Sequence, residues 1–415
     1  MKRFFIITIA LAAFAIGCTK SGILESPQTY DAPISFEPYT GKAPVTKASE
    51  VKTEHLYDAG FRVTGFVQGV IENGNYKGID TTSFYLDKKV YVASTLGEDG
   101  QKVYDVDDAG NKVWGYDDAM YWPEGKKLSF VAYGLNVNTG TALDNTDDIF
   151  KRTSGNYTAF SYTIPLEVAN QKDLVISPII QDKDRSSDNG RIPVQMYHVL
   201  SRVGFKVKAE GDAGIKMAIK NISMSSNFIR TATYYLTKAV TVSNGTVSYK
   251  FYPAKKTSTQ VTYSLFDSDY TLGSTTGDSR PGFITTSSTT AAPIWNNYSF
   301  APGATFNPAS VSDSDLLPST SNNFDNRYMM IMPQDADNAS LKVVYQLANA
   351  EEQEVNIPIG NFRFEPGKAY EFVFTLSTQL VGFEVDVNIW DPNNGDETNP
   401  ETVPIDKNYP VTPTI

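Results

Sequence analysis

The stretches YEFVFTL at residues 370–376 and FEVDVNI at residues 383–389 carry the clearest pattern in the chain. In both of them apolar and polar residues alternate, as where Phe383 and Val385 alternate with Glu384 and Asp386. Successive side chains of a β-strand point to opposite faces, so a period of two predicts strands that are half-buried. We therefore predict two antiparallel strands with one face in the core and one face in water.

Similar patterns extend over both halves of the chain, beginning with the alternation of Phe61 and Val63 with Arg62 and Thr64. Further strand candidates lie at 84–93, 112–116, 127–134, 173–177, 217–223, 231–236, 246–252, 260–265, 326–332 and 341–347. Alternating strand–helix units are absent, and 415 residues suit two domains. The sequence therefore predicts an all-β fold of two sandwiches in tandem.

A charged segment without apolar residues, DKDRSSDNG at 182–190, marks the predicted boundary between these domains. We place an N-terminal β-sandwich at 59–192 and a C-terminal β-sandwich at 193–390. A tail rich in Asn, Pro and Thr follows at 391–415.

Two segments of the second half depart from the strand pattern. Ile192, Met196 and Val199 recur at helical spacing and predict a short helical turn. The Ser/Thr/Gly/Pro-rich stretch at 266–320 is too long for a core loop, so we expect an elaborated surface feature there.

The N-terminus has the features of an exported protein. A basic start, Met1–Arg3, precedes an apolar run from Phe4 to Ile16, and residues 1–17 are therefore predicted to be a signal peptide. The tetrad Ala15–Cys18 resembles a bacterial lipobox, which implies cleavage before Cys18 and acylation of its thiol. Cys18 is the only cysteine, so an intramolecular disulfide is excluded.

Residues 18–58 connect this anchor to the first sandwich. A short polar tether leads to a first extended segment that begins at Pro33 and ends at Gly41. Residues 42–58 contain a proline, small residues and the lysines at 42, 47 and 52, and they predict an exposed loop.

The charge and the motifs argue against several classes of protein. A net charge of −11 and a pI near 4.8 argue against nucleic-acid binding, which requires a basic surface. The two histidines, His55 and His198, form no metal-spaced pair. The acidic turn at 105–110 has Ala109 where a calcium ligand should stand, so a solvated turn is favoured. We expect no enzyme, no cofactor and no metal site.

Several motifs, taken in their order along the chain, are similar to those of a known family. They are ISFEPYTG at 34–41, Thr46–Ala48, YWPEG at 121–125 before LSFVAY at 128–133, YHVLSRVGF at 197–205, FEPGKAY at 364–370 and the closing strand that ends at Trp390. Their order over nearly the whole chain resembles the fimbrillin-like proteins of Bacteroidales, which are type V pilins.

This resemblance implies two transthyretin-like sandwiches and assembly by exchange of strands between subunits. The precursor would be a lipoprotein of the outer membrane, exposed at the cell surface, and its mature form would belong to a fimbrium that supports adhesion. A trypsin-like protease would cut after Lys47, with Lys42 and Lys52 as alternatives. The partners implied are other pilin subunits, that protease, the membrane lipid at Cys18, and glycans or proteins of host or bacterial surfaces.

The resemblance also assigns the two strands that would exchange. The displaced strand would contain Ile34, Phe36 and Tyr39. The donor strand would be the tail, where one parity holds Val403, Ile405, Tyr409, Val411 and Ile415. Pro404, Pro410 and Pro413 interrupt its ladder because proline has no N–H, so a stalk, tip or anchor position stays open.

Two functions from other classes remain as alternatives. One is a monomeric surface lipoprotein that binds glycans for a polysaccharide uptake system, with sugars stacking on Tyr57, Tyr76, Tyr298 or Tyr328. The other is a lipoprotein hydrolase, because carboxylate pairs on distant loops leave little trace in a sequence.

Overall fold

The structure is a computed structural model that describes most of the two predicted sandwich regions. It describes residues 33–39, 55–67, 71–72, 75–76, 84–98, 101–135, 145–146, 150–152, 158–209, 216–266, 270–285, 291–304, 306–307, 310–316, 328–347, 350–376, 380–389 and 401–410. The N-terminal signal region, Cys18 and most of the 42–58 loop lie outside these residues.

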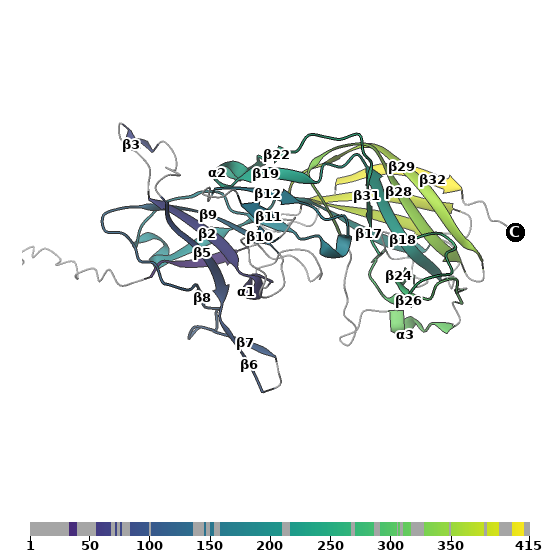
Figure 1. Cartoon of the computed structure of the whole chain (residues 1–415), viewed down its shortest axis with the longest axis horizontal. Helices are drawn as coiled ribbons and strands as arrows, with labels where there is room; N and C mark the ends of the chain where they lie inside the picture. The colour runs from purple at the N-terminus through teal and green to yellow at the C-terminus, as the bar shows by residue number, and fades with distance from the viewer. Residues whose placement is uncertain are drawn as a thin grey trace, which may run out of the picture.

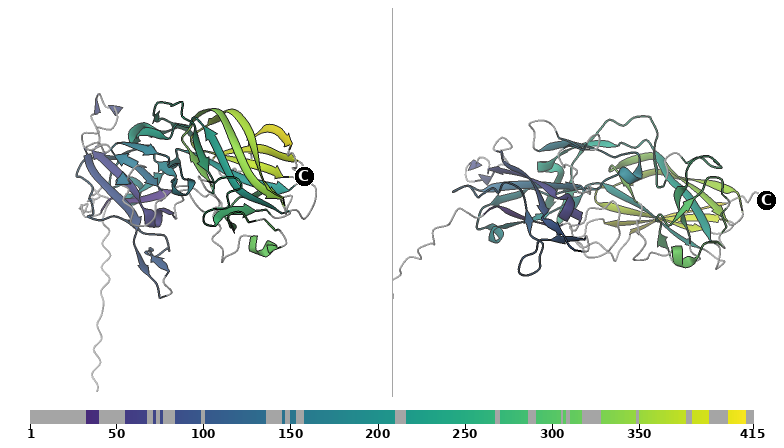
Figure 2. Two further views of the ribbon diagram at one scale, coloured as in Figure 1. Left: turned by 45° about the vertical axis from the view of Figure 1, so that its right-hand side comes forward. Right: turned by 60° about the horizontal axis from the view of Figure 1, so that its bottom comes forward.

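The described residues form β-sheets almost throughout, which confirms the predicted all-β class (Figure 1). Their helices are single turns: α1 (His55–Ala59), α2 (Leu236–Ala239), α3 (Asp313–Leu316), and 3₁₀ turns at Val168–Asn170 and Ser187–Gly190. Within this part of the chain we find no helix with the length and apolar character needed to cross a membrane. The sheets group into two lobes that lie side by side along the long axis (Figures 1 and 2).

The first lobe is built around a seven-stranded sheet with the order β16-β13-β9-β2-β5-β8, in which β14 pairs with β9. Its strands are β2 (Phe61–Val67), β5 (Phe84–Val92), β8 (Trp114–Gly115), β9 (Leu128–Leu135), β13 (Leu174–Ile176), β14 (Ile180–Lys183) and β16 (Tyr197–His198). Every residue of β9 is buried, because its run LSFVAYGL has apolar side chains on both faces. This sheet therefore needs cover on each side.

One face of the seven-stranded sheet is covered by a five-stranded sheet. Its strands are β10 (Asn145–Thr146), β11 (Phe150–Arg152), β12 (Ala159–Thr163), β19 (Thr231–Tyr235) and β22 (Tyr252–Pro253). Tyr133 of β9 packs on Phe160 with ring centroids 5.2 Å apart, and Phe160 stacks on Tyr234 at 5.5 Å.

The opposite face is covered by a two-stranded parallel sheet of β1 (Ser35–Tyr39) and β15 (Arg191–Gln195). Phe61 and Phe130 of the central sheet join the apolar side chains of these two strands in a separate core cluster. The first lobe is thus a three-layered arrangement.

The second lobe is a β-sandwich of two six-stranded sheets. One sheet holds β17 (Ser201–Ala209), β25 (Ala292–Pro293), β27 (Met329–Ile331), β30 (Lys368–Leu376), β31 (Leu380–Ile389) and β32 (Glu401–Pro410). The other holds β18 (Met217–Ser226), β23 (Val261–Ser264), β24 (Arg280–Ile284), β26 (Tyr298–Phe300), β28 (Gln334–Leu347) and β29 (Glu352–Phe364). Phe205, Phe372, Val343 and Ile357 meet in the core between them.

Three short hairpins complete the described strands. They are β3 (Ile71–Glu72) with β4 (Asn75–Tyr76), β6 (Ser94–Leu96) with β7 (Lys102–Tyr104), and β20 (Val240–Ser243) with β21 (Thr246–Tyr249). The β6–β7 hairpin projects away from the first lobe (Figures 1 and 2).

Strand pairing crosses the predicted domain boundary at 192/193. In the five-stranded sheet, β12 from the first half of the chain pairs with β19 from the second half, with Ser161 opposite Thr233. One apolar cluster also includes residues of both lobes, among them Val131, Leu200 and Phe372. The proposed limits 59–192 and 193–390 stay predictions, and residues 231–253 contribute strands to the first lobe.

The predicted helical turn around Ile192, Met196 and Val199 is wrong. Residues 191–195 and 197–198 are strands β15 and β16, because Ile192, Val194 and Met196 also follow a period of two and bury that face.

Two predicted surface segments are more ordered than expected. The end of the 42–58 loop forms α1, where Leu56 is fully buried. Within 266–320, β24 pairs with the core strand β18, and Phe306 and Val311 pack against the sandwich. The latter segment is therefore a cover of the second lobe with its own small core.

Candidate functional site: the first strand and its groove

Strand β1 is joined to the first lobe by one neighbouring strand. It pairs in parallel with β15 over its whole length, from Ser35 opposite Arg191 to Tyr39 opposite Gln195. These two strands form a sheet of their own, so β1 is an edge strand. Withdrawal of β1 therefore leaves the backbone N–H and C=O groups of β15 without their partners.

The side chains of β1 and of the residue before it fill an apolar groove. Ile34 and Phe36 are each 1% exposed. The Phe36 ring meets the Phe130 ring edge-on, with centroids 5.2 Å apart and an interplanar angle of 82°. Ile192 and Val194 of β15 belong to the same core cluster, so the groove has apolar walls on both the sheet side and the β15 side.

Polar contacts hold the N-terminal end of β1 in place. The Tyr116 hydroxyl donates a hydrogen bond of 2.7 Å to the carbonyl oxygen of Ile34, whose own N–H donates to the Met120 carbonyl oxygen at 2.8 Å. The Ser35 hydroxyl donates to the carbonyl oxygen of Gly190 at 2.9 Å. Burial raises the pKa of Tyr116 to about 12, so this phenol stays a donor at neutral pH.

The tail forms an edge strand of the second lobe. Strand β32 pairs in antiparallel fashion with β31, with Val403 opposite Val385 and Tyr409 opposite Val381. Between Phe383 and Val385 the register shifts, opposite the segment that contains Pro404. Proline lacks the N–H that a regular ladder requires, which explains the irregularity.

The predicted exchange residues are only partly described. Ile34, Phe36 and the backbone of Tyr39 lie at β1, and Val403, Ile405 and Tyr409 lie in β32. The other predicted site residues lie outside the described residues: Cys18, Lys42, Lys47, Lys52, Val411 and Ile415.

His198 and the acidic turn at 105–110 make contacts within the fold. His198 is buried, and its Nδ1 lies 2.8 Å from a carboxylate oxygen of Asp173. In the acidic turn, Asp107 accepts hydrogen bonds from the Asn111 N–H at 2.8 Å, from the Asn111 side-chain amide at 3.2 Å and from the Ala109 N–H at 3.0 Å, and these bonds, those of Asn111 above all, lower the pKa of Asp107. Asp107 therefore stabilises the turn itself. The described residues contain no group of three potential ligands that could hold a metal ion.

The tyrosines suggested for sugar stacking differ in their surroundings. Tyr57 packs against Tyr104 and Trp114 at 5.3 and 5.5 Å, and Tyr298 packs on Phe300 at 4.8 Å. Tyr328 is 5% exposed, and the Arg202 guanidinium lies 4.5 Å from its ring. The side chain of Tyr76 lies outside the described residues.

Sequence reasoning missed the groove residues Tyr116, Ile192 and Val194. The period of two in residues 192–196 was a signal that Ile192 and Val194 lie on one face of a strand, although a helical spacing matched the same segment. Tyr116 has no local signal, because its partner Ile34 is 82 residues away.

Comparisons with known proteins give a family and a fold. A family model described as fimbrillin-like matches residues 80–390. A solved fimbrial protein from Bacteroides vulgatus is 17% identical, with 86% of this chain and 99% of that chain covered and a TM-score of 0.50. Two proposed cell adhesion proteins are also similar: one from Bacteroides uniformis (13% identity, 88% and 100% covered, TM-score 0.41) and one from Bacteroides ovatus (12%, 86% and 98%, 0.43). No curated protein matches the chain.

Proposed function

Because the chain belongs to the fimbrillin-like family, we propose that it is a structural or accessory subunit of a type V pilus that supports adhesion. It is made as a lipid-anchored precursor, cut in the loop after its first strand, and assembled by exchange of strands. The observation that carries this proposal is β1, a short edge strand that covers an apolar groove and has one pairing partner.

The strength of the β1 contacts supports its release after a cut. Complete burial of an Ile or Phe side chain contributes about 1.5–3 kcal/mol, so Ile34 and Phe36 together contribute roughly 3–6 kcal/mol. Each hydrogen bond adds about 0.5–1.5 kcal/mol net. Association of two separate chains costs about 4–15 kcal/mol. The gain and the cost are of similar size, so β1 can leave the groove once the loop is cut.

The cut falls at a lysine in this proposal, with Lys47 as the first choice and Lys42 and Lys52 as alternatives. Arg62 is the first arginine after the signal region, and it lies in β2 with its guanidinium 2.6 Å from the Asp87 carboxylate. A residue in a central paired strand does not offer the extended, accessible chain that a protease needs. The protease is therefore trypsin-like and acts on lysine.

The tail fills the opened groove of the next subunit. An extended segment that enters the groove gains hydrogen bonds to β15 and pockets for alternate side chains. Val403, Ile405, Tyr409, Val411 and Ile415 share one parity and supply those side chains. Because this exchange joins the tail of one subunit to the groove of another, it does not close on itself and builds a filament.

The proposal places the precursor on the outer membrane through the lipid on Cys18 and the mature subunit in the fimbrium. Its partners are further pilin subunits and the maturation protease. Surface glycans or proteins are the targets of adhesion.

Limited trypsin treatment of the full chain tests this function. We expect mass spectrometry to detect a cut after Lys47 and electron microscopy to show filaments after the cut only. A variant with Lys42→Gln, Lys47→Gln and Lys52→Gln should remain uncut in this loop and remain monomeric. The matched control replaces Lys102 and Lys112 of the first lobe and should assemble like the unchanged chain. Filaments from the variant that is not cut in this loop contradict the proposal.

A further inference from the structure

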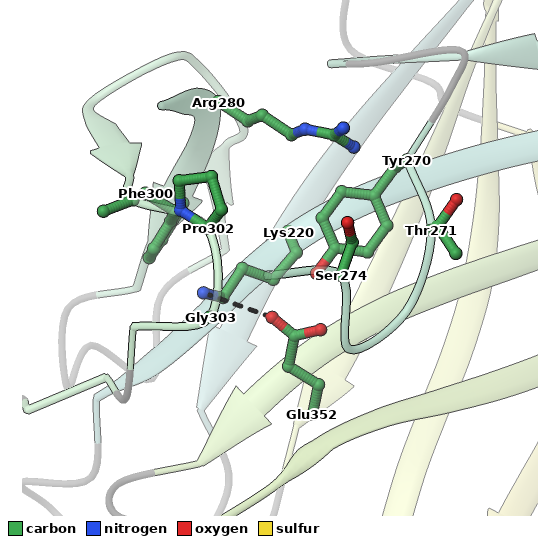
Figure 3. Close-up of a pocket in the computed structure, with 10 residues that line it drawn as sticks. Lys220, Tyr270, Thr271, Ser274, Arg280, Phe300, Pro302, Gly303 and Glu352 are labelled. Carbon is green, nitrogen blue, oxygen red and sulfur yellow. Dashed lines mark ion pairs between the residues drawn. The ribbon is translucent and has the colours of Figure 1, made fainter. Parts of the chain in front are cut away.

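The small space on the outer face of the second lobe holds an ion pair and has no room for a ligand. Figure 3 shows Lys220 and Glu352 there, with the Lys220 Nζ 3.6 Å from Glu352 Oε1. The cavity beside them has a volume of about 20 Å³, which is enough for about one water molecule. Glu352 Oε2 also accepts the N–H of Gly273 at 2.9 Å. Glu352 therefore fastens the covering segment to the sandwich.

The groove under β1 is a larger recess, and it has three buried positions in a row. They are occupied by Ile34, Phe36 and Pro38. Ser35 between them is half-buried and Glu37 is exposed. This is the alternation of a regular strand, and the register with β15 shows no shift along β1. A strand that replaces β1 must therefore bring apolar side chains to these three positions in the same alternation.

The backbone of β1 distinguishes the buried positions from those between them. The Ile34 N–H donates to the Met120 carbonyl oxygen, and the Ile34 carbonyl oxygen accepts from the Tyr116 hydroxyl, so both groups are engaged away from β15. Backbone groups of successive residues in a strand point to alternate sides. The positions between the buried ones therefore face β15, and the buried positions do not. Pro38 lies at a buried position, where β15 requires no N–H.

These positions set two requirements for the part of the tail that enters the groove. A lysine does not suit a buried position, because burial of an unpaired charge is costly. A proline does not suit a position that faces β15, because it has no N–H to give to the pairing.

One window of the tail meets both requirements. The residues of the apolar parity are the odd-numbered ones from 403 to 415, and every window with Lys407 at a buried position fails. The window that begins at Tyr409 places Pro410 at the position of Ser35, which faces β15, so it fails too. The window 411–415 passes, because its proline, Pro413, takes a buried position.

We propose that residues 411–415 are the donor segment and lie in the groove of the next subunit, in the direction of β1. Val411, Pro413 and Ile415 take the three buried positions in that order. Residues 401–410 form β32 and precede this segment, so β32 can stay paired with β31 in its own subunit. The inference rests on the proposed strand exchange and narrows its donor to five residues.

The side chains of this window differ from those of β1 at one place. Thr412 takes the position of Ser35, whose hydroxyl donates to the Gly190 carbonyl oxygen at 2.9 Å, and a threonine hydroxyl can make the same bond. Pro413 takes the position of Phe36 and is smaller, so the space beside Phe130 is filled only in part. A phenylalanine at 413 should therefore fit the groove better than the proline.

Filament formation after trypsin treatment, followed by electron microscopy, tests this register. A chain that ends at Pro410 keeps all residues of β32 and should be cut in the 42–58 loop yet form no filaments. Val411→Asp should reduce filament formation at least tenfold, because its carboxylate enters a buried position. Thr414→Asp is the matched control: it takes the position of the exposed Glu37 and should assemble like the unchanged chain. Pro413→Phe should slow the dissociation of filaments in mild denaturant at least tenfold.

Thermal unfolding of each uncut variant separates a defect of assembly from a defect of folding. Filaments from the chain that ends at Pro410 overturn this inference, and they leave the strand exchange in place if a chain shortened before Val403 forms none. Equal losses in Val411→Asp and Thr414→Asp, or no slower dissociation in Pro413→Phe, overturn the register. Absence of filaments from the cut full chain overturns the proposed function and this inference with it.

Discussion

Replacement of Phe36 with alanine should loosen the first strand while the central sheet of the first lobe keeps its structure. The side chain is 1% exposed, and its ring contacts those of Phe130 and Tyr116 at 5.2 and 6.1 Å. Truncation of a buried Phe to Ala costs about 3–5 kcal/mol, because apolar burial is lost and a cavity remains. Phe36 lies in an edge strand, so this loss lowers the free energy of opening β1.

Hydrogen exchange measured by mass spectrometry checks this prediction in the uncut precursor. A loss of about 3 kcal/mol corresponds to a rise in exchange of roughly a hundredfold for residues 33–39, because about 1.4 kcal/mol is a factor of ten. The fully buried strand β9 should exchange as slowly as before. Phe84→Ala is the matched control, since Phe84 is 39% exposed in β5, and it should cost about 1 kcal/mol or less.

Two results refute this reasoning about Phe36. Exchange of 33–39 within about threefold of the unchanged protein, a difference under about 1 kcal/mol, means that Phe36 does not hold the strand. An equal gain in exchange in β9 means that β1 is part of one cooperative unit and cannot leave alone.

Three further predictions concern the strand, the anchor and the two lobes. Tyr116→Phe removes the hydrogen bond to the Ile34 carbonyl and should ease β1 opening by about 0.5–1.5 kcal/mol in hydrogen exchange. The raised pKa of Tyr116, about 12, means that this contribution is complete below pH about 10 and is lost only as the pH rises toward 12, so the effect should be equal at pH 6 and 8. Cys18→Ala should abolish labelling by fatty-acid analogues and release the precursor from membranes, and continued labelling contradicts the lipid assignment. Proteolytic cleavage within 182–190 should leave two fragments that elute together in size-exclusion chromatography, because β12 and β19 pair across the cut, and separate elution contradicts the shared sheet.

The strands that sequence reasoning placed best are those with a clear period of two. The alternation at 370–376 lies within β30, and that at 383–389 lies within β31. The predicted water-facing side of the first strand is wrong: Glu371 and Val373 are 5% and 3% exposed, and the Arg202 guanidinium 3.6 Å from the Glu371 carboxylate balances the charge of this buried side chain. At Ile192 the pattern fitted both a helix and a strand. The strand forms because Ile192 and Val194 then face the same apolar groove, and β1 supplies the hydrogen bonds of that edge.

Pairings between distant segments left no trace in the sequence. The parallel pairing of Ser35 with Arg191 and the antiparallel pairing of Ser161 with Thr233 depend on tertiary packing, which local periodicity does not encode. The Lys220–Glu352 pair is of the same kind, since its members belong to two strands and its cover comes from a third segment. Sequence reasoning therefore found the first strand and the tail, while the groove under the first strand required the structure.

Filament formation by a chain shortened before Val403 tests the strand exchange most directly. The full chain and the shortened chain are treated with trypsin, compared by electron microscopy, and checked by thermal unfolding. The account predicts that the shortened chain is cut after Lys47 as readily as the full chain, forms no filaments alone, and shortens the filaments of the full chain when mixed with it. Its groove can then accept a tail, but it has no tail to donate. Filaments of normal length from the shortened chain alone contradict the account, because the tail is then not the donor.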